Sequence, residues 1–265
     1  NVDHSDTSVG ILDSGVGGLS VLLEIRKKLP GIPIHYIGDS AWCPYGNKPA
    51  EQIQARTFLV TEKLIAMGAR TVVVACNSAT IHAVEALRAR YPINFVGMEP
   101  AVKPASKLTK TGTIGVLATE ASIAGEKFHK LLRTQVHPKG LRVITQPCPD
   151  FVTLVENGTL SGHEVEAAVR QYALPLVKAG ADTLVLGCTH YPFLRESIQK
   201  VLGLSVRLLD TGEAVARRTT SLITLDRGHG EISIHTTGNL ACLERLFPIL
   251  CPSLTADLSQ LQIGE

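Results

Sequence analysis

The stretch TVVVACNSAT, residues Thr71–Thr80, decides the fold of this chain. Its β-branched run predicts a buried strand that delivers Cys76 to a turn of small polar residues, and the spacing that follows predicts an amphipathic helix over Ile81–Arg90. In an open α/β sheet, ligands bind at the carboxyl ends of the strands. A thiol near a helix N-terminus also lies in a positive field that favours the thiolate. Cys76 is therefore a candidate for chemistry.

A second copy of this stretch strengthens that candidacy. Gly68–Cys76 (GARTVVVAC) aligns without a gap on Gly180–Cys188 (GADTLVLGC). A glycine-marked strand precedes each cysteine by a similar interval, at Val9–Ser14 and at Ile114–Thr119. The chain is therefore predicted to hold two similar α/β units that face each other and bring Cys76 and Cys188 to one cleft.

Size and composition fit two globular domains. The chain has 265 residues, of which 45% are hydrophobic and 19% charged, and its 26 basic and 24 acidic side chains give a net charge of +2. This balance, with few aromatic residues, gives no reason to expect a nucleic-acid partner. No apolar run reaches the length that spans a membrane, so a membrane role is not expected either.

The N-terminus and the cysteines indicate a cytoplasmic protein with reduced thiols. Residues Asn1–Ser8 are polar, carry no secretory signal and are expected to form a loose tail. Six cysteines spread over the chain form no CxxC pair, so neither a disulfide scaffold nor a metal site is expected. Four of them have no duplicate and no adjacent base and are interpreted as structural: Cys43, Cys148, Cys242 and Cys251.

Short apolar strands alternate with longer helical patterns, which predicts parallel sheets covered by helices. The predicted strands are Val9–Leu12, Ile34–Ile37, Thr71–Ala75, Ile93–Val96, Thr113–Leu117, Leu141–Thr145, Thr183–Leu186, Val206–Leu209 and Ile232–His235. The predicted helices are Gly18–Leu29, Pro49–Met67, Ile81–Arg90, Ala124–Leu132, His163–Lys178 and Phe193–Leu202. Linkers are predicted at Met98–Ala101 and around Asp210–Gly212. We therefore predict two pseudo-symmetric, flavodoxin-like α/β domains: a discontinuous one over residues 9–99 plus 211–255, and a second over 100–210.

Two loops of the first half carry polar groups at strand ends. Asp13–Gly18 follows a strand and opens a helix, so its free amides suit a carboxylate or phosphate, although it fits neither GxGxxG nor a Walker motif and is also typical of a tight turn. Asp13 is an acid at the strand end beside Cys76. After Asp39, the turn at Pro44–Asn47 offers the Tyr45 hydroxyl and the Gly46 amide to orient a polar ligand, although a plain surface loop would look the same.

Small polar residues follow both cysteines directly. Asn77 and Ser78 follow Cys76, and Thr189 and His190 follow Cys188; all four suit carboxylate and ammonium groups, although Ser, Thr and Asn are also ordinary helix caps. The His190 imidazole can hold or relay the proton of Cys188.

Two thiols at one small polar site suit inversion of a carbon centre. If one cysteine is a thiolate and the other a thiol, one takes a proton from the carbon while the other delivers a proton to the opposite face, and no cofactor is needed. A disulfide oxidoreductase would need the sulfurs within bonding range, and an acyl-transfer cysteine would need no twin. A two-domain protein that binds an amino acid without reacting is a further alternative.

These motifs resemble the signature set of the glutamate racemases, in the aspartate/glutamate racemase superfamily. The resemblance runs from Val9 to the Asp210 region and rests on four motifs: Asp13–Gly18, Pro44–Gly46, Ala75–Ala79 and Gly187–Pro192. It implies two α/β domains with the active site in the cleft between them, cofactor-independent interconversion of L- and D-glutamate, and supply of D-glutamate for peptidoglycan. It also implies a homodimer, and it leaves aspartate racemase as the nearest enzyme alternative.

The resemblance also implies roles for individual residues. Cys76 would be the base for D-glutamate and Cys188 the base for L-glutamate, with Asp13 assisting Cys76, and His190 and Glu156 assisting Cys188. By itself, Glu156 also fits a solvated helix end. The implied substrate contacts are Asp13, Ser14, Tyr45, Gly46, Asn77, Ser78, Thr189 and His190. The sequence departs from the family pattern at Trp42, Ser78, Asp150 and Thr153.

Overall fold

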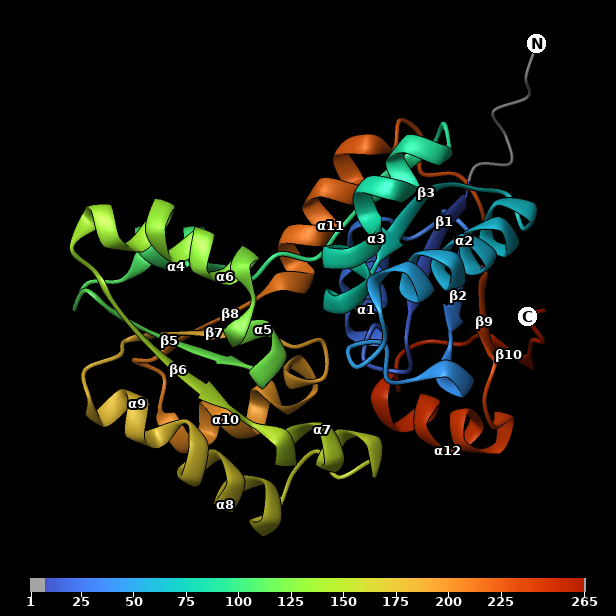
Figure 1. Cartoon of the computed structure of the whole chain (residues 1–265). Coiled ribbons are helices and arrows are strands. Elements are labelled where there is room, and N and C mark those ends of the chain that lie inside the picture. Colours follow the sequence, from blue (N-terminus) through green and yellow to red (C-terminus); the bar gives the residue numbers. More distant parts are fainter. Residues whose placement is uncertain (1–7, 265) are drawn as a thin grey trace. The chain divides into compact units, whose positions relative to one another are not determined.

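The computed structural model describes residues 8–264 and divides the chain into two compact units (Figure 1). Unit 1 runs to Met98 and resumes at Gly212, and unit 2 runs from Glu99 to Thr211. The tail predicted over Asn1–Ser8 lies, apart from Ser8, outside the described residues.

Unit 1 is built on six strands with helices between them. In chain order its elements are β1 (Ser8–Asp13), α1 (Leu19–Lys28), β2 (Ile34–Gly38), a 3₁₀ turn (Ser40–Trp42), α2 (Ala50–Ala66), β3 (Ala69–Val74), α3 (Asn77–Arg90), β4 (Asn94–Val96), α11 (Thr211–Leu222, which begins at the last residue of unit 2), β9 (Ile232–Thr236), α12 (Leu240–Leu250) and β10 (Asp257–Gln260). The strands lie in the order β10-β9-β2-β1-β3-β4, and every neighbouring pair is parallel. The segment after Gly212 thus adds two strands beside β2.

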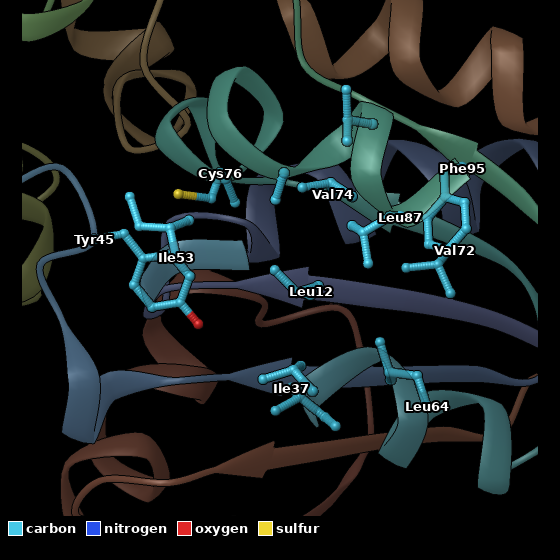
Figure 2. Close-up of a cluster of buried hydrophobic side chains, with 14 of the residues drawn as sticks. Leu12, Ile37, Tyr45, Ile53, Leu64, Val72, Val74, Cys76, Leu87 and Phe95 are labelled. Atoms are coloured by element: carbon cyan, nitrogen blue, oxygen red, sulfur yellow. The ribbon is translucent and has the colours of Figure 1, made fainter. Parts of the chain in front are cut away.

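The core of unit 1 on the α2 and α3 side explains why the TVVV run forms a strand. Val72 and Val74 point into a cluster with Leu64 of α2 and Leu87 of α3, and all four side chains are fully buried. Figure 2 shows Cys76 at one end of this cluster, near Tyr45, and Phe95 at the other. Since Val73 is fully buried as well, both faces of β3 are covered, as expected for a parallel sheet.

Unit 2 holds the smaller sheet. Its elements are α4 (Val102–Leu108), β5 (Thr113–Ala118), α5 (Glu120–Ala124), α6 (Glu126–Leu131), a π-helical turn (Leu132–Val136), a 3₁₀ turn (His137–Lys139), β6 (Arg142–Pro147), α7 (Pro149–Glu156), α8 (His163–Tyr172), α9 (Leu174–Lys178), β7 (Thr183–Leu186), a 3₁₀ turn (Tyr191–Leu194), α10 (Arg195–Leu202) and β8 (Arg207–Asp210). The strand order is β6-β5-β7-β8, all parallel. Helices α4 and α6 cover one face of this sheet, and α8, α9 and α10 cover the other (Figure 1).

The duplication read from the sequence is also present in the backbone. Strand β1 pairs with β3 from Val9↔Thr71 to Leu12↔Val74, and β5 pairs with β7 in the same register, from Ile114↔Thr183 to Leu117↔Leu186. The residue before each cysteine makes the same bond: Ala75 N donates to Leu12 O at 2.8 Å, and Gly187 N donates to Leu117 O at 2.7 Å. Each cysteine therefore follows an equivalent strand, beside the first strand of its unit.

The predicted fold class is confirmed, and so are all nine predicted strands, within one or two residues at their ends. Helix boundaries were less accurate. The helix predicted from Ile81 begins at Asn77, and the one predicted over Ala124–Leu132 is divided at Gly125. The helix predicted over His163–Lys178 is divided before Pro175, which has no amide hydrogen to continue it. Apart from the 3₁₀ and π-helical turns, the elements of the described residues that were not predicted are α4, α7, α11, α12, β10 and α5, which shares only Ala124 with a predicted helix.

Among residues 8–264, no helix combines the length and the apolar character needed to cross a bilayer.

Candidate active site

Cys76 lies at the carboxyl end of β3 and immediately precedes α3. Its backbone is extended, and its carbonyl accepts the first bond of the helix, from Thr80 N at 2.9 Å. Its side chain is buried, with 9% exposed. The Sγ atom accepts hydrogen bonds from the amides of Ser78 and Ala79 and from the Ser14 hydroxyl. Two predicted substrate contacts, Ser14 and Ser78, therefore lie against this sulfur.

The amides at the start of α3 favour the Cys76 thiolate, as expected, but two opposing effects are larger in the free protein. Burial raises the pKa of the Cys76 thiol, and the Asp13 carboxylate raises it further, to about 12. The bonds from Ala79, Ser14 and Ser78 favour the thiolate but do not offset these two effects. At neutral pH, Cys76 is thus a thiol, which suits it to donate a proton.

Asp13 is buried at the end of β1, within reach of two internal donors. Its Oδ2 accepts a bond from Gly18 N at 2.8 Å and lies 2.8 Å from the Tyr36 hydroxyl, which also lies 2.6 Å from Gly15 O. The glycine-rich turn was predicted to offer its amides to a ligand, but the Gly18 amide is engaged by this carboxylate. The turn therefore holds Asp13 beside Cys76.

The hydroxyl of Tyr45 was predicted to orient a ligand, but it is part of a buried ionic network. Tyr45 is 1% exposed, and its hydroxyl donates to Asp39 Oδ2 at 2.7 Å. Asp39, fully buried, also accepts two bonds from Arg56, at 2.7 and 2.8 Å, and one from the Thr237 hydroxyl at 2.6 Å. These bonds join the loop after β2 to α2 and to the end of β9, and they fix the turn that carries Gly46.

Gly46 lies beside the residues that follow Cys76. A Cβ at this position would lie 3.1 Å from Ser78 Oγ, so the Gly46 backbone and the Ser78 side chain are neighbours. Asn77 is the first residue of α3. Unit 1 thus brings Asp13, Ser14, Gly46 and Ser78 together around the Cys76 loop.

In unit 2, three side chains contact one another in series, ending at Cys188. His190 Nδ1 lies 3.8 Å from Cys188 Sγ, and His190 Nε2 lies 3.2 Å from Glu156 Oε1. Cys188 and Thr189 follow the end of β7 after one intervening residue, whereas Glu156 is the last residue of α7, 34 residues before His190. The structure therefore brings together the cysteine, the histidine and the glutamate that the sequence singled out.

The surroundings of His190 favour the cationic form of its imidazole. Burial by itself lowers the pKa of His190, but its bonds to Cys188 and Glu156 outweigh burial and raise that pKa to about 10. The bond from His190 holds the pKa of Glu156 below its usual value. A negative charge on Cys188 Sγ would thus have a cation as its neighbour, which suits this sulfur to act as a base.

The two cysteines therefore have different partners despite their equivalent strands. The position in unit 2 that corresponds to Asp13 is Ala118, because Leu12 and Leu117 occupy matching places in the two sheets. A carboxylate is absent there, and Cys188 instead has His190, two residues after it, which contacts Glu156. The duplicated framework thus carries two different ways of holding a proton.

Sequence reasoning missed residues that contact Asp39 and one that lies near Cys188. Arg56 and Thr237 complete the Asp39 network from 17 and 198 residues away, and no local pattern marks them. Cys148, interpreted as structural, is buried near Cys188, whose charge contributes to raising the pKa of the Cys148 thiol after the larger effect of burial. In the part of the chain described, no group of three His, Cys, Asp or Glu side chains has the arrangement of a metal site.

Comparison with known proteins agrees with this geometry. The family model for Asp/Glu/Hydantoin racemases matches residues 19–219. A glutamate racemase from Herpetosiphon aurantiacus is 50% identical over 218 residues, which cover 82% of this chain and 85% of that protein. The chain belongs to the glutamate racemase family. It is therefore an enzyme of the amino-acid racemase class, an isomerase.

Solved structures of other family members share the fold of this racemase. Glutamate racemase from Escherichia coli, crystallised with L-glutamate and the activator UDP-MurNAc-Ala, aligns with a TM-score of 0.86 at 30% identity, over 98% of this chain and all of that one. A glutamate racemase from Bacillus anthracis aligns with a TM-score of 0.82 at 33% identity, over 98% and 99% of the two chains. The racemase thus matches these relatives over nearly their whole length.

Proposed function

We propose that this racemase interconverts L- and D-glutamate without a cofactor, with Cys76 and Cys188 as the two acid–base groups. The observation that carries the proposal is the pair of equivalent strands, β3 and β7, each followed by a buried cysteine with its own proton-holding partners. Glutamate as the substrate is supported by the relatives, which are glutamate racemases, one of them crystallised with L-glutamate. The mechanism requires both thiols to reach opposite faces of one α-carbon.

In the direction from L-glutamate, Cys188 is the base and Cys76 is the acid. The His190 cation stabilises the Cys188 thiolate that takes the α-proton, and Glu156 holds the imidazole in place. The Cys76 thiol then delivers its proton to the other face, for which its raised pKa suits it. In the direction from D-glutamate the roles reverse, and Asp13 lies close enough to Cys76 to assist removal of its proton.

A thiolate is a weak base for the α-proton of an amino acid, so the rest of the site must stabilise the carbanion. The burial of both sulfurs excludes water, which strengthens every electrostatic contact at the reacting carbon. Polar groups next to the cysteines, in Ser14, Asn77, Ser78 and Thr189, are positioned to bind the α-carboxylate and the ammonium group as charge develops. The backbone of Tyr45–Gly46 contributes beside Ser78, while the Tyr45 hydroxyl supports the loop.

Proton NMR of the purified protein in D₂O tests the proposal. With L-glutamate and no added cofactor, the α-proton signal should disappear while D-glutamate accumulates. A parallel sample with L-aspartate is the control for substrate class: exchange with aspartate alone would move the substrate to the smaller amino acid. Tight glutamate binding without any exchange would contradict racemisation and favour a binding protein.

Replacing His190 by asparagine should lower kcat about 10- to 100-fold and change KM less than about threefold. Asparagine keeps a polar group near Cys188 but removes the cation that stabilises its thiolate, a loss felt mainly in the transition state. Steady-state kinetics in both directions measure this effect, with His163→Asn on the exposed start of α8 as the control. A loss confined to KM would reassign His190 to plain substrate binding.

The cellular role that we propose is supply of D-glutamate for peptidoglycan, in the cytoplasm, by a homodimer. This part rests on the resemblance of the motifs to the family and on thiols that must stay reduced to act as acid and base. Sedimentation of the purified protein measures the dimer, and growth of a deletion strain with and without D-glutamate measures the cellular role.

A further inference from the structure

Thr80 holds the backbone of Cys76 through its side chain as well as through its amide. It is 2% exposed, and its hydroxyl lies 2.9 Å from Cys76 O and 3.2 Å from Val74 O, within donating distance of both. Thr80 N donates to the same Cys76 carbonyl at 2.9 Å. One residue thus fixes the end of β3 and the first turn of α3, between which Cys76 lies.

The same hydroxyl also binds the segment by which the chain leaves unit 1. Met98, the last residue of unit 1 before unit 2, donates its amide to Thr80 Oγ1 at 3.1 Å. The preceding residue, Gly97, packs so closely on Thr80 that a Cβ would lie 2.7 Å from Thr80 Cγ2. The Thr80 side chain therefore contacts this segment with its methyl group and its hydroxyl together.

We propose that Thr80 is a positioning residue for racemisation: its hydroxyl ties the Cys76 backbone to the start of the connection at Met98. The proposal rests on the acid–base role of Cys76 proposed above. Since a proton moves between sulfur and carbon only at close range, a small displacement of Cys76 slows every step in which this thiol takes part. Steps at Cys188 are left unchanged.

Thr80→Val tests the role because valine keeps the shape of threonine and removes only the hydroxyl. We expect kcat to fall about tenfold, which corresponds to about 1.4 kcal/mol, with KM within about twofold of the unsubstituted value. The substrate isotope effect on kcat/KM should grow for α-deuterated D-glutamate, whose deuteron goes to Cys76. The isotope effect should shrink for α-deuterated L-glutamate. In the variant, delivery of a proton by Cys76 becomes slower than removal of the deuteron by Cys188, so cleavage of the carbon–deuterium bond no longer limits the rate.

Three further variants make the test specific. Thr80→Ser keeps the hydroxyl and should restore both isotope effects. Thr219→Val is the matched control, because Thr219 of α11 is also fully buried and donates to the carbonyl four residues before it, that of Val215. Gly97→Ala displaces the Thr80 methyl group without removing the hydroxyl, and should shift the isotope effects as Thr80→Val does. It provides a second test of the role if Thr80→Val does not fold.

A measurement that does not depend on activity separates the role of Thr80 from the proposed function. Hydrogen exchange of the Met98 amide in the full chain should accelerate at least tenfold in Thr80→Val and stay unchanged in Thr219→Val. Unchanged Met98 exchange, or isotope effects that move equally for both enantiomers in an active enzyme, would overturn the role of Thr80 alone. An unsubstituted chain that does not racemise glutamate would instead overturn the proposed function, and with it the catalytic consequence of Thr80.

Discussion

Alanine at Cys76 or at Cys188 lowers the rate of glutamate racemisation by about 10³-fold or more and leaves the protein folded: this is the largest effect that we expect from a single substitution. Each thiol is one of two groups that must move a proton, and a general acid or base is commonly worth 10²- to 10⁴-fold. Removing one buried sulfur atom costs about 1 kcal/mol of stability, the scale of one buried CH₂ group. Circular dichroism and kinetics with each enantiomer measure the two effects.

The remaining thiol gives each variant a distinct signature. In Cys188→Ala, Cys76 can still take the α-proton of D-glutamate and return a deuteron to the same face, so D-glutamate exchanges in D₂O without inversion. Cys76→Ala should exchange only L-glutamate. Cys251→Ala and Cys148→Ala are matched controls, because both thiols are buried in the same units and neither is a proposed acid or base. Near-normal racemisation by either alanine variant at the two proposed acid–base cysteines would contradict the two-base mechanism.

Arg56→Met should destabilise unit 1 by about 3–5 kcal/mol, because it leaves the Asp39 carboxylate buried without its cation. Thr237 and Tyr45 still donate to Asp39 but bring no compensating charge. Urea unfolding followed by fluorescence of Trp42, the single tryptophan, measures the change in the unit that holds this network. Arg217→Met is the control: it removes an exposed ion pair with Glu213 in the same unit and should cost less than about 1 kcal/mol.

The cost of Arg56→Met should depend on pH in a defined direction. Burial by itself raises the pKa of Asp39, but the bonds from Arg56, Thr237 and Tyr45 outweigh burial and hold that pKa below its ordinary value. The unprotonated group therefore stabilises the fold above the unfolded pKa of about 3.9, and this contribution is lost as pH falls through the lower folded value. Since protonated Asp39 no longer needs the guanidinium, the difference between the two proteins should narrow at low pH. A difference that stays constant from pH 7 to pH 3 would contradict the ionic network.

The sequence was informative about strands because their signal is local. Runs such as Thr71–Val74 are β-branched and continuous, as buried parallel strands are. Strand β10 was missed because its sequence, DLSQ, is polar, and it forms only by pairing with β9 at the edge of the sheet. The helix after Cys76 was predicted four residues too late, because Asn77–Thr80 has the small polar residues of a turn while tertiary contacts make it the first turn of α3.

The site could be predicted where chemistry follows directly on a strand, as at Cys76 and Cys188. What the sequence could not give is the state of these groups. The helix N-terminus was expected to favour a charged Cys76, and its amides do so, but burial is the larger effect and its size cannot be read from the local sequence. Likewise, the Tyr45 hydroxyl was predicted to orient a ligand, but it donates to Asp39. This could not be foreseen, because Arg56 and Thr237, which complete the network around Asp39, lie elsewhere in the sequence.

The strand order of unit 1 has a consequence for synthesis of the chain on the ribosome. All four strands of unit 2 lie between Thr113 and Asp210, whereas β2 of unit 1 pairs with β9, whose Ser233 is 198 residues beyond its neighbour His35. A growing chain therefore completes the second unit first, and β2 remains an unpaired edge, open to wrong partners, until β9 emerges. A nascent chain that stalls before β9 thus exposes an aggregation-prone edge strand in addition to its unfolded C-terminal segment.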